Sequence, residues 1–139
     1  MTAVTPLPTR PFDDSTDSLL RFAMRLDATL SGLVGLFIAL MADSLSALTG
    51  LSSLAEFSGG ALLVLGGLAV YGLAAAPDLR RVGVGLIVGN VVLTLAALVV
   101  VAVGALPLTE AGVAATLATG GYFALMGYLQ YIGVRRLPA

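Results

Sequence analysis

Asp27 is the residue whose type and position most suggest chemistry. It lies near the start of a long apolar stretch, FAMRLDATLSGLVGLF, at residues 22–37. An ionisable group inside a membrane segment needs partners and often marks a proton or ion pathway. Asp27 and Asp43 would bracket about 24 Å of helix, less than the hydrocarbon thickness of about 30 Å. We therefore expect Asp27 to lie near the membrane interface, paired with an arginine, and a proton-coupling carboxylate is the alternative.

Uncharged polar residues also lie within the apolar segments. Asn90 is inside the third such segment, and by helical rise its depth is close to that of Ser31 in the first. A hydrogen bond between helices in a membrane contributes about 0.6–2 kcal/mol. We expect such residues to join helices, with an amide that binds a substrate as the alternative for Asn90. The candidate interhelical polar contacts are Asp27, Ser31, Asn90, Thr94 and Gln130.

The residue types that are absent exclude several kinds of chemistry. The chain has no His, Cys, Trp or Lys, and its seven basic residues are all Arg. It therefore has no thiol for redox chemistry, no imidazole as metal ligand or general base, and no lysine for a Schiff base. The sequence shows no nucleophile–base pair and no metal-binding cluster. We expect a protein that is not an enzyme and holds no cofactor or metal.

The composition is typical of a membrane protein. Of the 139 residues, 58% are hydrophobic and only 11% are charged, whereas about 25% of a soluble domain is charged. Crossing the hydrocarbon core takes about 20 mostly apolar residues, and four segments are long enough. We predict an all-α membrane protein, a bundle of four transmembrane helices with short loops, within a domain at 18–139. The predicted spans are 20–42, 54–76, 82–106 and 111–134.

Helix-boundary signals lie where the hydropathy changes. Ser53 and Glu56 have the spacing of a capping box at the second span. Asp78 and Thr109 are the expected N-caps of the third and fourth spans. In the loop after the first span, Leu recurs at every third position among Ser and Thr. This pattern favours equally a short interfacial helix that ends at Gly50 and a semi-ordered loop.

The arginines predict the orientation. Arg10 and Arg21 precede the first span, and the expected cytoplasmic edge comprises Arg25, Arg80, Arg81, Arg135 and Arg136. The two remaining loops contain no basic residue. By the positive-inside rule, both termini and the middle loop lie in the cytoplasm, with the chain in a bacterial inner membrane. Residues 1–17 are rich in Pro, Thr and Asp and lack the apolar core of a signal peptide, which predicts a flexible cytoplasmic tail.

Each predicted span has one face of small or polar residues. Helices in lipid associate through such faces, because small side chains let the backbones approach closely. In the first span, steps of four residues along the sequence give Asp27, Ser31, Gly35, Ala39 and Asp43. We expect this face to point into the bundle.

Three motifs resemble those of a known family. LRFAMRLDATLSGLVGL at the first span, the Asn in GLIVGNVVLTLAAL and the closing LQYIGVRR are similar to motifs of small four-helix bacterial inner-membrane proteins. The resemblance covers nearly the whole chain after the tail. Typical members have a Trp soon after the Asn, where this chain has Val92 and Leu93. The family has no established activity, so the resemblance implies the fold.

Two functions remain open at this point. We expect a non-catalytic accessory, assembly or stabilising subunit of a larger membrane complex, because the chain has small-residue faces, short loops and no catalytic groups. The alternative is a small homo-oligomeric transporter with Asp27 as the coupling carboxylate and Asn90, Tyr122 and Gln130 along the path. Expected partners are the lipid bilayer and either other membrane subunits or further copies of the chain. The net charge of −1 argues against nucleic acid.

Overall fold

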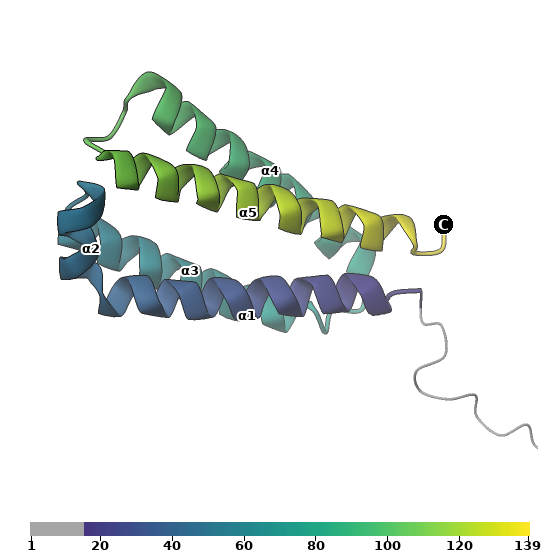
Figure 1. The fold of residues 1–139 in the computed structure, drawn as a ribbon. Helices are drawn as coiled ribbons and strands as arrows, with labels where there is room; N and C mark the ends of the chain where they lie inside the picture. Colours follow the sequence, from purple (N-terminus) through teal and green to yellow (C-terminus); the bar gives the residue numbers. More distant parts are fainter. Residues whose placement is uncertain (1–15) are drawn as a thin grey trace, which may run out of the picture.

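The structure is a computed structural model that describes residues 16–139. Its described part contains five α-helices (Figure 1): α1 (Ser18–Leu40), α2 (Ala42–Thr49), α3 (Ser53–Leu73), α4 (Leu79–Val103) and α5 (Glu110–Arg135). All except α2 are long and apolar enough to cross a membrane. The prediction of an all-helical chain with four such segments is confirmed. The predicted tail falls almost entirely outside the described residues.

The four long helices form two antiparallel pairs (Figure 1). α1 packs against α3, and α4 packs against α5. Contacts between α1 and α5 join the two pairs. α3 and α4 are consecutive in sequence and make few contacts with each other, so one side of the bundle is open between them.

Glycines bring α1 and α3 together backbone to backbone. A Cβ placed on Gly60 would lie 2.5 Å from the Gly35 carbonyl oxygen, and a Cβ on Gly67 would lie 2.7 Å from the Ala28 carbonyl oxygen. An ordinary contact between carbon and oxygen is about 3.3 Å or longer. The small-residue faces of these two helices therefore meet, and a larger side chain at either glycine would push them apart.

The first long helix ends earlier than predicted. α1 stops at Leu40, and Asp43 lies on α2 rather than on the face that carries Asp27. Of the two alternatives for this loop, the structure has the helix, which ends at Gly50 with a φ of 87° in the left-handed region. The Thr109 N–H donates a hydrogen bond of 3.0 Å to the Thr49 carbonyl oxygen. α2 is thereby attached to the loop between α4 and α5.

Side-chain caps begin the last three long helices. Asp78 and Thr109 cap α4 and α5 as predicted, each accepting a hydrogen bond from the backbone N–H three residues on. For α3 the predicted cap is wrong by one residue. Ser52 has the extended backbone of an N-cap and accepts the bond, whereas Ser53 is already helical. Glu56 does not complete a capping box and contacts the last residue of α2 instead.

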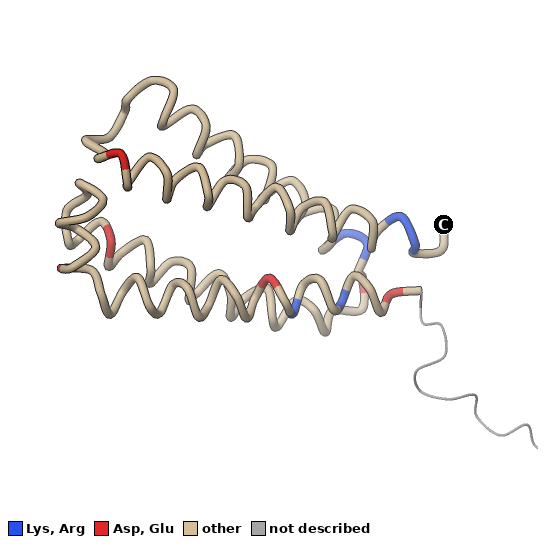
Figure 2. Tube along the Cα trace, in the orientation of Figure 1, with Lys and Arg blue, Asp and Glu red and all other residues tan. Residues whose placement is uncertain are grey.

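The described arginines gather at one end of the bundle (Figure 2). They are Arg21, Arg25, Arg80, Arg81, Arg135 and Arg136. Arg21 donates a hydrogen bond of 2.6 Å to the Ala74 carbonyl oxygen, which ties the start of α1 to the end of α3. Arg80 donates one of 2.6 Å to the Pro138 carbonyl oxygen, beyond the end of α5. The opposite end carries the acidic residues Asp43, Glu56 and Glu110.

Candidate functional site

Asp27 points into the bundle, whereas Arg25, two residues before it on α1, is exposed. Asp27 is 5% exposed and nine residues after the start of α1, which is about 13 Å along the helix. The predicted pairing with an arginine is wrong. Within residues 16–139, the arginine ion pairs are Arg21 with Asp17 and Arg81 with Asp78. α1 begins more than two turns before Asp27, and the carboxylate faces α5 rather than the end where the arginines lie.

Neutral hydrogen-bond donors surround the Asp27 carboxylate. Its Oδ1 accepts a bond of 2.7 Å from the Tyr122 hydroxyl and one of 3.1 Å from the Ser31 hydroxyl. Its Oδ2 accepts a bond of 2.9 Å from Nε2 of Gln130. Ser31 is one turn further along α1, and the other two donors are on α5. The carboxylate therefore joins these two helices.

Gln130 extends the network to α4. It is fully buried, and its Oε1 accepts a hydrogen bond of 2.9 Å from Nδ2 of Asn90. The Asp27 carboxylate accepts from Gln130, so the amide of Gln130 points its NH₂ at Asp27 and its oxygen at Asn90. Asn90 must then use its own NH₂ toward Gln130. Its Oδ1 accepts no hydrogen bond from any residue that the structure describes.

The structure places the other predicted candidates as follows. Ser31 and Asn90 do not bond directly, because Asp27 and Gln130 lie between them. Thr94 stays outside the side-chain network, and its hydroxyl is within hydrogen-bond distance of the backbone carbonyls of Asn90 and Gly120, at 2.8 Å and 3.2 Å.

Tyr122 is the member of the network that sequence reasoning missed as a contact. The sequence suggested it only as a residue along a transport path. It lies eight residues before Gln130, a separation that puts both side chains on one face of α5. This spacing is the signal that could have linked Tyr122 to the polar cluster.

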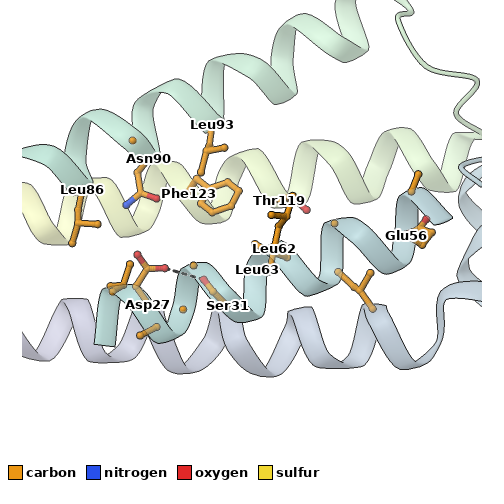
Figure 3. A pocket seen from close by; sticks show the side chains of 18 of the residues that line it. Asp27, Ser31, Glu56, Leu62, Leu63, Leu86, Asn90, Leu93, Thr119 and Phe123 are labelled. Carbon is orange, nitrogen blue, oxygen red and sulfur yellow. Dashed lines mark hydrogen bonds between the residues drawn. The ribbon is translucent and has the colours of Figure 1, made fainter. Parts of the chain in front are cut away.

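A pocket opens beside this network, between the two helix pairs (Figure 3). Its volume is about 570 Å³, within the range of about 300–1,000 Å³ that small-molecule sites occupy. Asp27 and Asn90 point toward one another from α1 and α4 at its polar end. The walls beyond them are apolar and include Leu62, Leu63, Leu86, Leu93 and Phe123.

The open side of the pocket lies between α3 and α4. Gly59 and Gly66 line it from α3, and Gly85 and Gly89 line it from α4. All four are exposed, and a Cβ on any of them would meet no atom within 4 Å. Adjacent glycines of α3 thus have different surroundings, since Gly60 contacts the backbone of α1. The opening would face lipid if the long helices span a bilayer.

A second carboxylate lines the pocket at the opposite end. Glu56 is 8% exposed and accepts a hydrogen bond from the Thr49 hydroxyl. It belongs to the first turn of α3, where the helix dipole stabilises negative charge. Asp27 lies well inside its helix and has only neutral donors around it. No basic residue of the described chain lines the pocket.

Residues 16–139 contain no group of three or more acidic side chains that could hold a metal ion. Comparison with protein-family models, with curated proteins and with solved structures finds no match to the chain. The family resemblance noted in the sequence stays a prediction. The function must therefore be inferred from the pocket and the network beside it.

Proposed function

We propose that the chain is a non-catalytic protein of the bacterial inner membrane, with both termini in the cytoplasm, that binds amphiphilic molecules between α3 and α4. The pocket carries this proposal. It is an apolar cavity of about 570 Å³ with polar groups at its ends, and it opens between two helices long enough to span the bilayer. A molecule could enter it sideways from the membrane, with its chain along the walls and its polar group at Asp27.

Several features of the site support binding over catalysis. The pocket offers no His, Cys or Lys, because the chain contains none. The hydroxyls of Ser31 and Tyr122 donate hydrogen bonds to the Asp27 carboxylate and help to hold α1 against α5. What remains for a ligand is an apolar wall and a few acceptor atoms, which suits recognition of a mostly apolar molecule.

The test is to fill the pocket without disturbing the packing. Gly89 lines the pocket, and a Cβ on it would meet no atom within 4 Å. Gly89→Leu therefore places an apolar side chain in the pocket. Gly121→Leu is the matched control, because Gly121 is equally open and does not line the pocket. The assay is saturable binding of radiolabelled dodecylamine to the protein in phosphatidylcholine nanodiscs, with empty nanodiscs subtracted.

We expect Gly89→Leu to weaken this binding at least about tenfold, and Gly121→Leu to leave it within about twofold of wild type. A tenfold loss corresponds to about 1.4 kcal/mol. Absence of saturable binding to the wild-type protein would remove the proposal, and so would equal losses in the two variants.

Transport is one use of such a pocket, and the position of Asp27 at its polar end favours it. In that role, copies of the chain would assemble and Asp27 would engage the transported molecule. Proton-coupled flux of dodecylamine in liposomes tests this use. Equal rates for wild type and Asp27→Asn would remove Asp27 as the coupling group while leaving the binding proposal intact.

An accessory subunit of a larger membrane complex is a second candidate, and the surface of α4 favours it. α4 packs mainly against α5, and its outer side chains Val84, Val88, Val91 and Val99 are exposed. A transmembrane helix of another protein could cover this surface. Purification in several mild detergents tests the idea. A partner that stays bound at fixed stoichiometry supports it, and isolation of the chain alone in every detergent refutes it.

A further inference from the structure

The polar end of the pocket presents hydrogen-bond acceptors. Asn90 is 6% exposed. Its NH₂ is bonded to Gln130, and its Oδ1 accepts no hydrogen bond from the described residues. A carboxylate offers about four lone-pair sites. Three donors occupy three of these sites on Asp27, so about one remains for a ligand. A ligand that completes this site must therefore donate hydrogen bonds to both residues.

The orientation of the two amides makes this preference a property of the whole network. The Asp27 carboxylate requires a donor from Gln130, and Gln130 in turn requires a donor from Asn90. Neither amide can rotate without placing two like groups against each other. The Asp27 carboxylate therefore determines that Asn90 presents its Oδ1, and not its NH₂, to the pocket.

The charges around the pocket also favour a ligand that donates hydrogen bonds. Asp27 is buried, its partners are neutral, and the described residues place no arginine in the pocket. Glu56, at the far end, has the N-terminus of α3 to stabilise its charge. A buried charge is stabilised most by an opposite charge that also forms hydrogen bonds with it. Asp27 is therefore the carboxylate that a bound cation would compensate.

We propose that the pocket selects amphiphiles with a protonated amine, whose ammonium group donates hydrogen bonds to the Asp27 carboxylate and to Oδ1 of Asn90. The inference rests on the function proposed above, since it names the class of ligand for the same pocket. An alkylammonium has three N–H donors and a positive charge, which matches two acceptors of which one is anionic. Its chain lies along the apolar walls toward Glu56, on the side that opens between α3 and α4.

Two ligands of equal chain length test this proposal. Dodecylamine is protonated at about pH 7.5, as a lysine side chain is, whereas dodecanol keeps the chain and one donor but has no charge. Binding of each is measured with full-length protein in phosphatidylcholine nanodiscs. We expect the wild-type protein to bind the amine at least about tenfold more tightly than the alcohol, because charge-assisted hydrogen bonds are about twice as strong as neutral ones.

Three variants locate the interaction. Asp27→Asn should abolish the preference for the amine, and Glu56→Gln, which changes the other carboxylate of the pocket, should keep it. Asn90→Ala leaves the bond between Asp27 and Gln130 in place and should weaken amine binding about threefold or more, with little effect on the alcohol. The Asn90 variant keeps the proposal testable if Asp27→Asn does not yield folded protein.

The outcomes separate this inference from the proposed function. Equal affinity of wild type for amine and alcohol would overturn the selection of cations and leave the pocket as a site for amphiphiles in general. A preference lost in Glu56→Gln and kept in Asp27→Asn would overturn the assignment to Asp27. Failure of both ligands to bind the wild-type protein would overturn the proposed function together with this inference.

Discussion

The contact between α1 and α3 leads to a sharp prediction, because adjacent glycines of α3 have opposite surroundings. A Cβ on Gly60 would lie 2.5 Å from the Gly35 carbonyl oxygen and 2.6 Å from the Ala39 nitrogen, whereas a Cβ on Gly59 would meet no atom within 4 Å. Gly60→Ala should therefore destabilise the protein, and Gly59→Ala should not. The two variants differ by one position and carry the same added methyl group.

The magnitude follows from the same distances. Restoring a contact of about 3.3 Å requires α1 and α3 to separate locally by roughly 0.8 Å, and both atoms that Gly60→Ala would meet belong to the backbone. Overpacking of this kind costs about 1–3 kcal/mol. Gly59→Ala has no such cost and gains helix propensity of up to about 1 kcal/mol. We expect the free energies of unfolding of the two variants to differ by about 2–3 kcal/mol.

The assay is reversible unfolding of the full-length chain in mixed micelles, in which the fraction of SDS is raised and helix content is followed by circular dichroism. The free energy of unfolding of Gly60→Ala should fall below that of wild type, and that of Gly59→Ala should equal or exceed it. Values for the two variants within about 0.5 kcal/mol of each other, less than the overpacking cost expected, would show that α1 and α3 do not meet at this face.

Two further predictions concern the polar network and the orientation. Gln130→Leu removes one of the three side-chain donors to the buried Asp27 carboxylate and the acceptor of the Asn90 NH₂, so we expect the free energy of unfolding to fall by about 2–4 kcal/mol. In the same assay Thr29→Val, which loses only a hydroxyl bonded within its own helix, should change it by less than about 0.5 kcal/mol; equal effects would refute the network. Because the chain has no Cys, single cysteines can report the sides of the membrane to an impermeant maleimide. Ala139→Cys should react only after the cytoplasmic face is made accessible. Ser44→Cys should react in intact cells. The reverse pattern would refute the orientation.

Much of the architecture follows from the order of the residues. The long helices, the caps at Asp78 and Thr109 and the gathering of arginines at one end could all be predicted. These features depend on local properties, since apolar length decides whether a helix can span lipid and a short polar side chain satisfies the first free N–H groups. Such reasoning locates a cap only to within about one residue. The prediction chose Ser53, whereas the adjacent Ser52, with the same side chain, is the cap.

The environment of Asp27 could not be predicted in this way. Its charge and apparent depth indicated an arginine partner, but hydropathy reports position along the membrane normal and says nothing of which helix lies opposite. In the structure α5 faces Asp27 and supplies Tyr122 and Gln130. The donor set around the carboxylate is therefore a consequence of which helices pair.

The pocket arises from the same pairing. α3 and α4 follow one another in sequence, yet each packs on a different partner, and the space between them remains open. Sequence alone was enough for the four long helices and for the caps at Asp78 and Thr109, because each of these depends on a single segment and its solvent. Which glycine of a pair meets another backbone and which faces the pocket depends on the rotation of two helices about each other, and close packing settles that rotation only when all the segments come together.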